Sequence, residues 1–183
     1  MKVAVFGAGT MGSGIAQVFA AHGHTTLMYA SSVASAQRHR EKLDASLQKR
    51  VEKGKMTQEA KDALMANILV EEKSAAADAD LVIECAKEEM AYKRAMLTEL
   101  DELCKDSTIF ATNTSSLSVT EMGLGLKHPV IGMHFFNPVP SMKLVEVIRG
   151  ANTTQETFDF IYKLSEEIGK QPVEVAEAPG FVV

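Results

Sequence analysis

The feature that most constrains this chain is a group of glycines directly after a short apolar segment at its N-terminus. Residues 2–6 are an apolar, valine-containing run that predicts a β-strand, and residues 10–21 have the apolar spacing of a helix. Residues 25–29 are a second strand candidate. The junction between the first strand and the helix reads Gly7, Ala8, Gly9, Thr10, Met11, Gly12. This strand, Gly-x-Gly-x-x-Gly turn and helix predict a binding site for the pyrophosphate of a dinucleotide.

Each glycine of the motif has a physical role in such a site. Gly7 allows the tight turn, Gly9 lets a pyrophosphate approach the backbone, and Gly12 lets the helix pack close to the strand. The helix N-terminus then points its N–H groups toward the phosphates. The competing interpretation is a helix start with incidental glycines. We favour the dinucleotide site because strand, spacing and helix are all in place.

The acid that usually completes this site is missing. A carboxylate at the end of the second strand normally accepts hydrogen bonds from the adenosine ribose. That place is occupied by Ala30, which is followed by Ser31 and Ser32. Two interpretations stay open. Either the site takes NADP, with the two serines as donors and Arg38 or Arg40 nearby, or it takes NAD with lower affinity.

Length, composition and charge narrow the class of protein. A chain of 183 residues fits one domain, and 46% hydrophobic with 23% charged residues is a globular mixture. The formal net charge of −5 leaves no general basic surface, so we expect no nucleic-acid partner. The uncharged stretch 3–21 contains four glycines and several polar residues, which argues against a membrane span. We therefore expect no membrane association.

The cysteines and histidines give no sign of a disulfide framework or a metal site. The two cysteines, Cys85 and Cys104, are too few for a disulfide-stabilised fold, which suits a reducing, cytoplasmic compartment. His22 and His24 are too few ligands to hold a metal ion. We expect a cytoplasmic protein without a metal centre.

Strand and helix patterns alternate along the whole chain. Further strands are expected at 68–70, 81–84, 108–111, 130–134, 144–148 and 173–175, and further helices at 32–53, 57–66, 90–103, 118–122 and 155–168. Such alternation predicts an α/β fold with a doubly wound, mostly parallel sheet of the Rossmann type. The helices at 32–53 and 57–66 form a helical excursion after the second strand. We expect one dinucleotide-binding domain over residues 1–183.

One histidine is the candidate base for proton transfer. His134 ends the predicted strand 130–134, and a turn-rich segment leads to the next strand, 144–148. If the two strands fold back around Pro140, His134 faces Glu146. The carboxylate would fix the tautomer of the imidazole, whose other nitrogen could exchange a proton with a substrate hydroxyl. A buried structural histidine is the competing interpretation.

A polar segment follows the predicted strand 108–111. Asn113, Thr114, Ser115 and Ser116 lie where the carboxyl edge of a parallel sheet presents its side chains to ligands. Their hydroxyl and amide groups are hydrogen-bond donors. The competing interpretation is that they cap the helix predicted at 118–122, which serine and threonine do well.

Five segments together resemble a known family. The NAD-binding domain of the 3-hydroxyacyl-CoA dehydrogenases, and above all of bacterial 3-hydroxybutyryl-CoA dehydrogenases, is similar to this chain over its whole length. The resemblance implies that the 3-hydroxyl of a short acyl-CoA is oxidised to a ketone, or the reverse, with hydride exchanged with NAD or NADP. It also implies a place in fatty-acid and butyrate metabolism. The segments are 7–12, 113–117, 132–138, 142–148 and 178–182.

The resemblance implies roles for individual residues. His134 would exchange the hydroxyl proton, Glu146 would orient it and stabilise its imidazolium form, and Ser115 would bind the reacting oxygen near the nicotinamide. Asn113 would lie beside Ser115 at the substrate. Further contacts to the cofactor would come from the glycine motif, Ala30, Glu88, Lys93 and Asn137. For Lys93, the residues alone would suggest a solvated helix face.

The resemblance also implies an acyl-CoA partner. Ser46 and Lys53, seven residues apart on the helix expected at 32–53, would contact coenzyme A. They lie within a local basic cluster that includes Lys49, Arg50 and Lys55, which suits phosphates but is also typical of a solvated helix face.

The chain departs from the family in two respects. Ala30 stands where the family has an aspartate that binds the ribose. Family members also continue into a helical C-terminal domain, which forms the dimer interface and adds an asparagine to the active site. We expect that domain to be absent here and Ala178, Pro179 and Gly180 to begin a connection to it. The full-length parent would be a homo-oligomer.

The alternative function is a non-catalytic dinucleotide-binding module, or a half-enzyme that needs a separate C-terminal domain.

Overall fold

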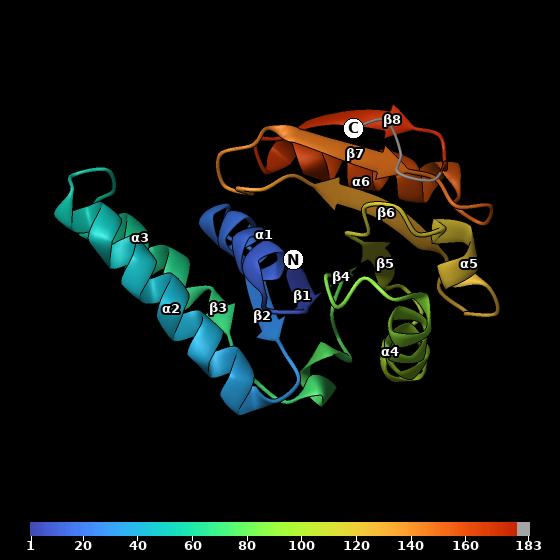
Figure 1. Ribbon diagram of the computed structural model, residues 1–183, viewed down its shortest axis with the longest axis horizontal. Helices are drawn as coiled ribbons and strands as arrows, with labels where there is room; N and C mark the ends of the chain where they lie inside the picture. Colours follow the sequence, from blue (N-terminus) through green and yellow to red (C-terminus); the bar gives the residue numbers. More distant parts are fainter. Residues whose placement is uncertain (179–183) are drawn as a thin grey trace.

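The computed structural model describes residues 1–178, which fold around one twisted sheet (Figure 1). In these residues the sheet has eight strands in the order β3-β2-β1-β4-β5-β6-β7-β8. Neighbouring strands are parallel except for β6 and β7, which are antiparallel. The strands are β1 (Lys2–Phe6), β2 (Thr25–Tyr29), β3 (Ile68–Leu69), β4 (Leu81–Glu84), β5 (Ile109–Thr112), β6 (Val130–Phe135), β7 (Leu144–Ile148) and β8 (Gln171–Val175).

Helices cover both faces of the sheet, because successive side chains of a strand point to opposite faces. Val3 and Val5 of β1 pack into a core with α1 and α6, whereas Ala4 and Phe6 pack into a second core with α4 and α5. Both cores are apolar, so the inner strands are buried on both sides. The helices are α1 (Thr10–Ala21), α2 (Val33–Glu52), α3 (Gln58–Ala66), α4 (Met90–Leu103), α5 (Val119–Gly123) and α6 (Gln155–Glu167), with a 3₁₀ helix η1 (Lys73–Ala76).

The expected helical excursion is the α2–α3 hairpin, which extends to one side of the sheet (Figure 1). Ser32 and Thr57 cap the two helices by accepting hydrogen bonds from main-chain N–H groups, and Gly54, with φ of +66°, lies in the turn between them. The guanidinium of Arg40 donates to the carbonyl oxygens of Met65 and Ile68 at 3.0 Å each. Arg40 therefore fastens α2 to the end of α3 and the start of β3.

The elements expected from the sequence are confirmed, with shifts of one or two residues at their ends. The strand expected at 108–111 begins one residue later because the Thr108 N–H donates to the Lys105 carbonyl at 2.9 Å and so closes a turn before β5 starts. The 3₁₀ helix η1 was not expected. The predicted connection at Pro179 and Gly180 lies outside the described residues.

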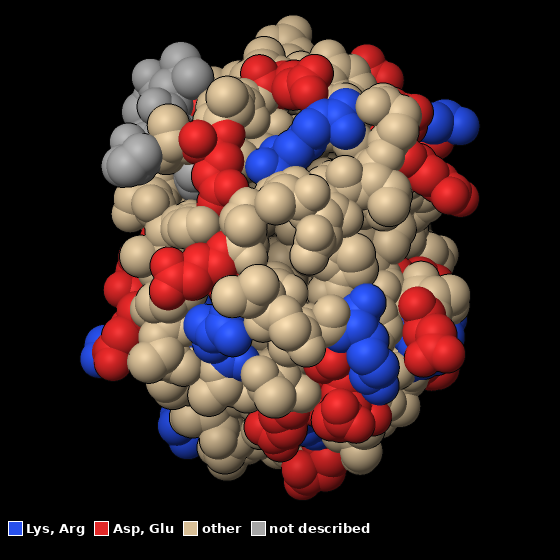
Figure 2. All heavy atoms as spheres, turned by 90° about the vertical axis from the view of Figure 1, so that its right-hand side faces the viewer, with Lys and Arg blue, Asp and Glu red and all other residues tan. Residues whose placement is uncertain are grey.

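The surface carries both signs of charge. On the face in Figure 2, Lys and Arg side chains alternate with Asp and Glu side chains and do not gather into one basic area. Within residues 1–178, no helix is both long enough and apolar enough to cross a bilayer.

Candidate active site

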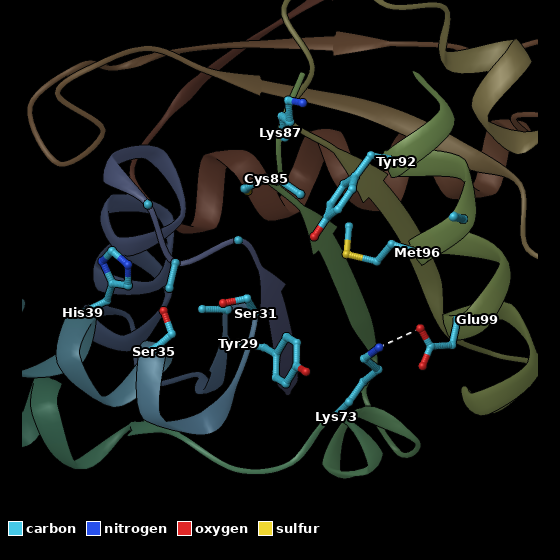
Figure 3. Close-up of a pocket in the computed structure, with 16 residues that line it drawn as sticks. Tyr29, Ser31, Ser35, His39, Lys73, Cys85, Lys87, Tyr92, Met96 and Glu99 are labelled. Atoms are coloured by element: carbon cyan, nitrogen blue, oxygen red, sulfur yellow. Dashed lines mark hydrogen bonds and ion pairs between the residues drawn. The ribbon is translucent and has the colours of Figure 1, made fainter. Parts of the chain in front are cut away.

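Two adjoining pockets open at the carboxyl ends of the parallel strands. The first, here called the glycine-loop pocket, has a volume of about 590 Å³ and lies between the β1–α1 turn, the end of β2 and helix α4 (Figure 3). The second, here called the His134 pocket, has a volume of about 350 Å³ and is lined by His134, Asn137 and Ser115. Cys85 and Ala86 line both, so the two pockets are neighbours. Ligands of open α/β sheets bind at this edge.

The glycine turn has the geometry that its sequence predicts. Gly7 has φ of +114°, and a Cβ there would lie 2.4 Å from the Cys85 carbonyl oxygen. A Cβ on Gly12 would lie 1.8 Å from the Gly7 carbonyl oxygen, so only glycine allows this close packing. A Cβ on Gly9 would meet nothing within 4 Å, and no side chain caps α1 there. The open space and the uncapped N–H groups fit a pyrophosphate.

The end of β2 borders the glycine-loop pocket without providing a carboxylate. Ala30 and Ser31 line the pocket. Of the other residues expected at this end, neither Ser32 nor Arg40 is among the described lining residues of the pocket. The Ser32 hydroxyl accepts from the Ser35 N–H as the cap of α2, and Arg40 is committed to two main-chain carbonyls. Arg38 is not part of the described lining.

The pairing of His134 with Glu146 is confirmed. The antiparallel register of β6 and β7 places the two residues opposite each other, and Nδ1 of His134 lies 2.7 Å from Oε2 of Glu146. Glu146 is fully buried, and within residues 1–178 its Oε1 has no hydrogen-bond partner. The imidazole is therefore the group that compensates this buried carboxylate among the described residues. Nδ1 must donate, so Nε2 is the nitrogen that would exchange a proton with a substrate.

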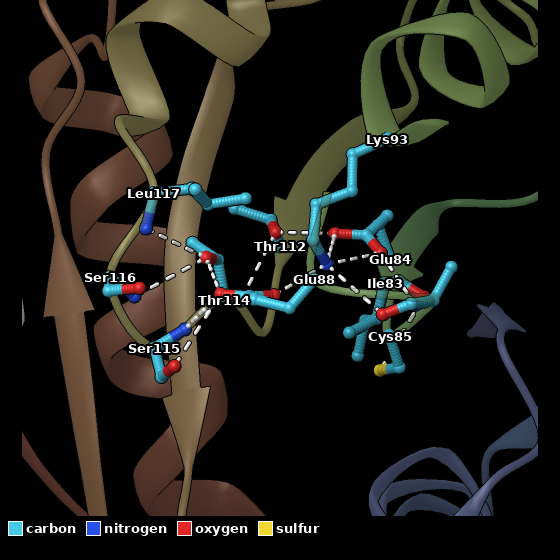
Figure 4. Close-up of polar contacts among 11 residues, drawn as sticks. Ile83, Glu84, Cys85, Glu88, Lys93, Thr112, Thr114, Ser115, Ser116 and Leu117 are labelled. Atoms are coloured by element: carbon cyan, nitrogen blue, oxygen red, sulfur yellow. Dashed lines mark hydrogen bonds and ion pairs between the residues drawn. The ribbon is translucent and has the colours of Figure 1, made fainter. Parts of the chain in front are cut away.

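A buried ionic network borders the His134 pocket, which Glu88 and Lys93 line (Figure 4). Nζ of Lys93 lies 2.8 Å from both carboxylate oxygens of Glu84 and 3.0 Å from Oε2 of Glu88. Glu84 also accepts from the Thr112 hydroxyl at 2.6 Å and from the Ala86 N–H at 2.5 Å. Lys93 is only 1% exposed, so the interpretation of a solvated helix face is wrong. An ammonium this deeply buried requires its carboxylate partners.

The network extends to the segment that holds Ser115. Oε1 of Glu88 accepts from the Thr114 hydroxyl and, at 3.0 Å, from the Ser115 N–H. Burial raises the pKa of Glu88, but the Thr114 hydrogen bond and the charge of Lys93 outweigh it, so the pKa lies below its usual value. Oδ1 of Asn113 accepts from the Phe135 N–H at 2.8 Å. Ser115 and Asn113 are thus brought beside His134, with which they line one pocket.

The turn between β6 and β7 is fixed by a lysine that sequence reasoning missed. The turn includes the cis peptide bond between Asn137 and Pro138, and Asn137 lines the His134 pocket. Nζ of Lys170 donates to the carbonyls of Val139 at 2.5 Å and Met142 at 2.8 Å. Burial lowers the pKa of Lys170. Lys170 comes just after Gly169, and nothing in its sequence context indicates that it faces this turn.

The predicted coenzyme A residues are not brought to either pocket. Ser46 lies on the distal half of α2 and Lys53 is the residue that caps its C-terminus; both are exposed, and neither lines the glycine-loop pocket or the His134 pocket in the described structure. Glu84 is the other functional candidate that the sequence analysis missed. Its signal was a lone carboxylate at the carboxyl end of the otherwise apolar strand β4.

Comparison with known proteins decides the family. Residues 2–178 match the family model described as 3-hydroxyacyl-CoA dehydrogenase, NAD binding domain. The chain belongs to this family. A 3-hydroxybutyryl-CoA dehydrogenase from Clostridioides difficile is 48% identical over 100% of this chain and 66% of its own length. A 3-hydroxyadipyl-CoA dehydrogenase from Escherichia coli is 44% identical over 99% of this chain and 39% of its own length.

Solved structures give the same result for the fold. A 3-hydroxybutyryl-CoA dehydrogenase from Escherichia coli superposes with a TM-score of 0.94 at 43% identity, covering 98% of this chain and 39% of that protein. An (S)-3-hydroxybutyryl-CoA dehydrogenase from Ralstonia eutropha has a TM-score of 0.93 at 38% identity, covering 100% and 65%. The chain thus spans two thirds or less of these relatives. As a member of this family it has a site for a nicotinamide dinucleotide, and the two adjoining pockets fit one.

Proposed function

We propose that this chain is the dinucleotide-binding part of an oxidoreductase that interconverts short-chain 3-hydroxyacyl-CoA and 3-ketoacyl-CoA, such as 3-hydroxybutyryl-CoA and acetoacetyl-CoA. The observation that carries the proposal is the His134–Glu146 pair in a pocket that adjoins the glycine-loop pocket. A proton acceptor beside a dinucleotide site is the arrangement that alcohol oxidation requires. An NAD or NADP bound there would supply hydride transfer.

The glycine motif and its neighbours hold the cofactor. The uncapped N–H groups of α1 and the open space at Gly9 receive the pyrophosphate. Ala30 borders the adenosine end, while Glu88, Lys93 and Asn137 line the His134 pocket, where the nicotinamide end belongs. Glu88 and Lys93 are also bound to each other, so their network keeps the cofactor pocket in one shape.

His134 moves the proton. In the oxidation direction, Nε2 takes the proton of the 3-hydroxyl as the carbonyl forms, and in the reduction direction it returns that proton to the oxygen. The imidazolium formed in the first case faces the buried carboxylate of Glu146 at 2.7 Å. Among the described residues, the Glu146 carboxylate accepts a hydrogen bond from no other side chain. Its negative charge therefore stabilises the imidazolium form of His134.

Ser115 and Asn113 position the reacting oxygen. Both line the His134 pocket, and the Ser115 backbone is held by Glu88 at 3.0 Å. The Ser115 hydroxyl can donate a hydrogen bond to the substrate oxygen. The coenzyme A moiety would lie toward the distal end of α2, where Ser46 and the C-cap residue Lys53 are both exposed. A cytoplasmic location and homo-oligomers of the longer parent belong to the same proposal.

The test is oxidation of NADH and of NADPH in the presence of acetoacetyl-CoA, followed at 340 nm for the wild type and two variants. His134→Gln should lower kcat by about 10²–10⁴ while cofactor affinity stays within about twofold of the wild type. The matched control is His128→Gln, which alters another buried histidine–carboxylate pair but not the two pockets. Turnover that survives His134→Gln would refute the assigned role of the imidazole.

The second candidate function is a half-enzyme or a non-catalytic dinucleotide-binding module. It is supported by the coverage of the relatives, of which the chain spans 66% and 39%. Under this proposal the chain binds a dinucleotide but does not oxidise it with acetoacetyl-CoA. Adding a separately produced C-terminal domain from a homologous 3-hydroxybutyryl-CoA dehydrogenase distinguishes the two forms: a half-enzyme gains turnover, whereas a binding module does not.

A further inference from the structure

The adenosine end of the glycine-loop pocket has a charge distribution that differs from that of an NAD site. Among its described lining residues, Glu99 is the only carboxylate, and it is ion-paired with Nζ of Lys73 at 2.6 Å. At the end of β2, where an acid would accept from the ribose 2′-hydroxyl, the lining residue is Ala30. A 2′-hydroxyl there lacks a carboxylate acceptor from β2, and a 2′-phosphate meets no carboxylate from that strand, since the one acid of the described lining, Glu99, is ion-paired.

Hydrogen-bond donors replace the acid on this side of the pocket. Ser31, Ser35 and His39 line it at a spacing of four residues, which places them along one side of the start of α2 (Figure 3). The first turn of α2 carries no acidic residue.

Lys73 supplies a permanent positive charge at the same end. Its Nζ lies 5.7 Å from the ring centroid of Tyr29, the residue that precedes Ala30. The Glu99 contact uses one of the three donors of the ammonium, and both side chains of this pair are partly exposed. Such a pair contributes little to stability, so the lysine can also donate to a phosphate.

We infer that this end of the pocket binds the 2′-phosphate of NADP(H), and that the chain prefers NADP(H) to NAD(H). The inference rests on the proposed dinucleotide site and determines which cofactor that site takes. Ala30 determines the cofactor preference because it provides no carboxylate. Ser31 and His39 donate hydrogen bonds to the 2′-phosphate, and Lys73 balances the negative charge of the phosphate. The pocket therefore attains this preference without Arg38 or Arg40.

The test is calorimetric titration of the whole chain with NADPH and NADH, and with two fragments that differ by the 2′-phosphate, adenosine 2′,5′-bisphosphate and adenosine 5′-monophosphate. We expect NADPH to bind about tenfold more tightly than NADH, with the same order for the fragments. Binding of NADH as tight as that of NADPH, or tighter, overturns the inference and leaves the proposed function intact. If neither dinucleotide binds, both the inference and the proposed function fail.

Two variants test whether Ala30 and Lys73 cause the preference for NADP(H). Ala30→Asp restores the missing carboxylate and should weaken NADPH by about tenfold without weakening NADH, because the acid repels the phosphate and accepts from the ribose hydroxyl. The matched control is Ala45→Asp, the same substitution on the exposed distal half of α2, which should leave the ratio of the two affinities unchanged. Lys73→Gln, which can still bond Glu99, should weaken NADPH only. An unchanged ratio in both Ala30→Asp and Lys73→Gln overturns the inference.

Discussion

Breaking the buried pair of Glu84 and Lys93 should be one of the most destabilising single changes at the site, and Glu84→Gln tests this. Glutamine keeps the shape of the side chain but replaces one acceptor oxygen by an NH₂ group. All the groups that face Glu84, the Lys93 ammonium, the Thr112 hydroxyl and the Ala86 N–H, are donors. The variant therefore loses the ion pair, and its new NH₂ group faces another hydrogen-bond donor instead of an acceptor.

The magnitude follows from the burial of the pair. Removing one partner of a buried ion pair costs about 3–5 kcal/mol. Lys93 retains Glu88 at 3.0 Å, so we expect the lower end, a loss of about 3 kcal/mol in the free energy of unfolding. For a chain of this length, that corresponds to a decrease in Tm of about 6–12 °C.

Urea denaturation followed by circular dichroism measures the difference. The matched control is Glu89→Gln, which removes the partner of Lys87 in an exposed surface pair and should leave the free energy of unfolding nearly unchanged. The double variant Glu84→Gln/Lys93→Met should be less destabilised than Glu84→Gln, because it no longer contains a buried ammonium that has lost a carboxylate partner. A loss below about 1 kcal/mol in Glu84→Gln would refute the argument from desolvation.

Two further predictions concern the thiols and the response to acid. Burial and the charge of Glu84 raise the pKa of Cys85 well above its usual value, and burial raises the pKa of Cys104 to about 11. Neither thiol should therefore react rapidly with iodoacetamide at neutral pH until the chain is unfolded, although Cys85 lines both pockets. Burial raises the pKa of Asp101, but hydrogen bonds from the N–H groups of Lys127 and His128 outweigh it and the pKa is lowered. Because the pKa of Asp101 is lower in the folded chain, the unfolded chain binds its proton first as the pH falls. Tm should therefore stay constant from about pH 7 to 5 and decrease below about pH 4. Thermal unfolding across this range checks it, and a Tm that rises toward pH 3 would contradict it.

The parts of the site that the sequence predicted are those set by short-range patterns. A strand followed by a glycine motif and a helix has one geometry, so the positions of Gly7 and Gly12 followed from their spacing. The contact between His134 and Glu146 followed because two strands joined by one turn have their register fixed by the centre of that turn. A slip of one residue would have turned Glu146 to the opposite face of the sheet.

The parts that the sequence did not predict depend on which way a long side chain turns. Lys93 lies on a polar helix, and only the packing of α4 against the sheet shows that its ammonium meets Glu84. Arg40 was expected near the cofactor, yet its guanidinium reaches the carbonyls at the end of α3. Lys170 reaches a turn about thirty positions earlier in the chain. No periodicity in a sequence encodes such contacts, because they are set by tertiary packing.

Residues 1–178 contain two buried histidine–carboxylate pairs, and their positions separate a structural pair from the pair proposed to transfer a proton. His128 Nδ1 lies 2.6 Å from Asp101, its Nε2 lies 3.0 Å from the Lys105 carbonyl, and its ring stacks on Phe110. It precedes β6, at the amino end of the strand. His134 lies near the carboxyl end of the same strand, in the His134 pocket. The pair geometry alone therefore does not mark a proton-transfer site. The carboxyl end of the strand does, because there the imidazole meets the pocket that adjoins the glycine turn, and the two His→Gln variants measure that difference directly.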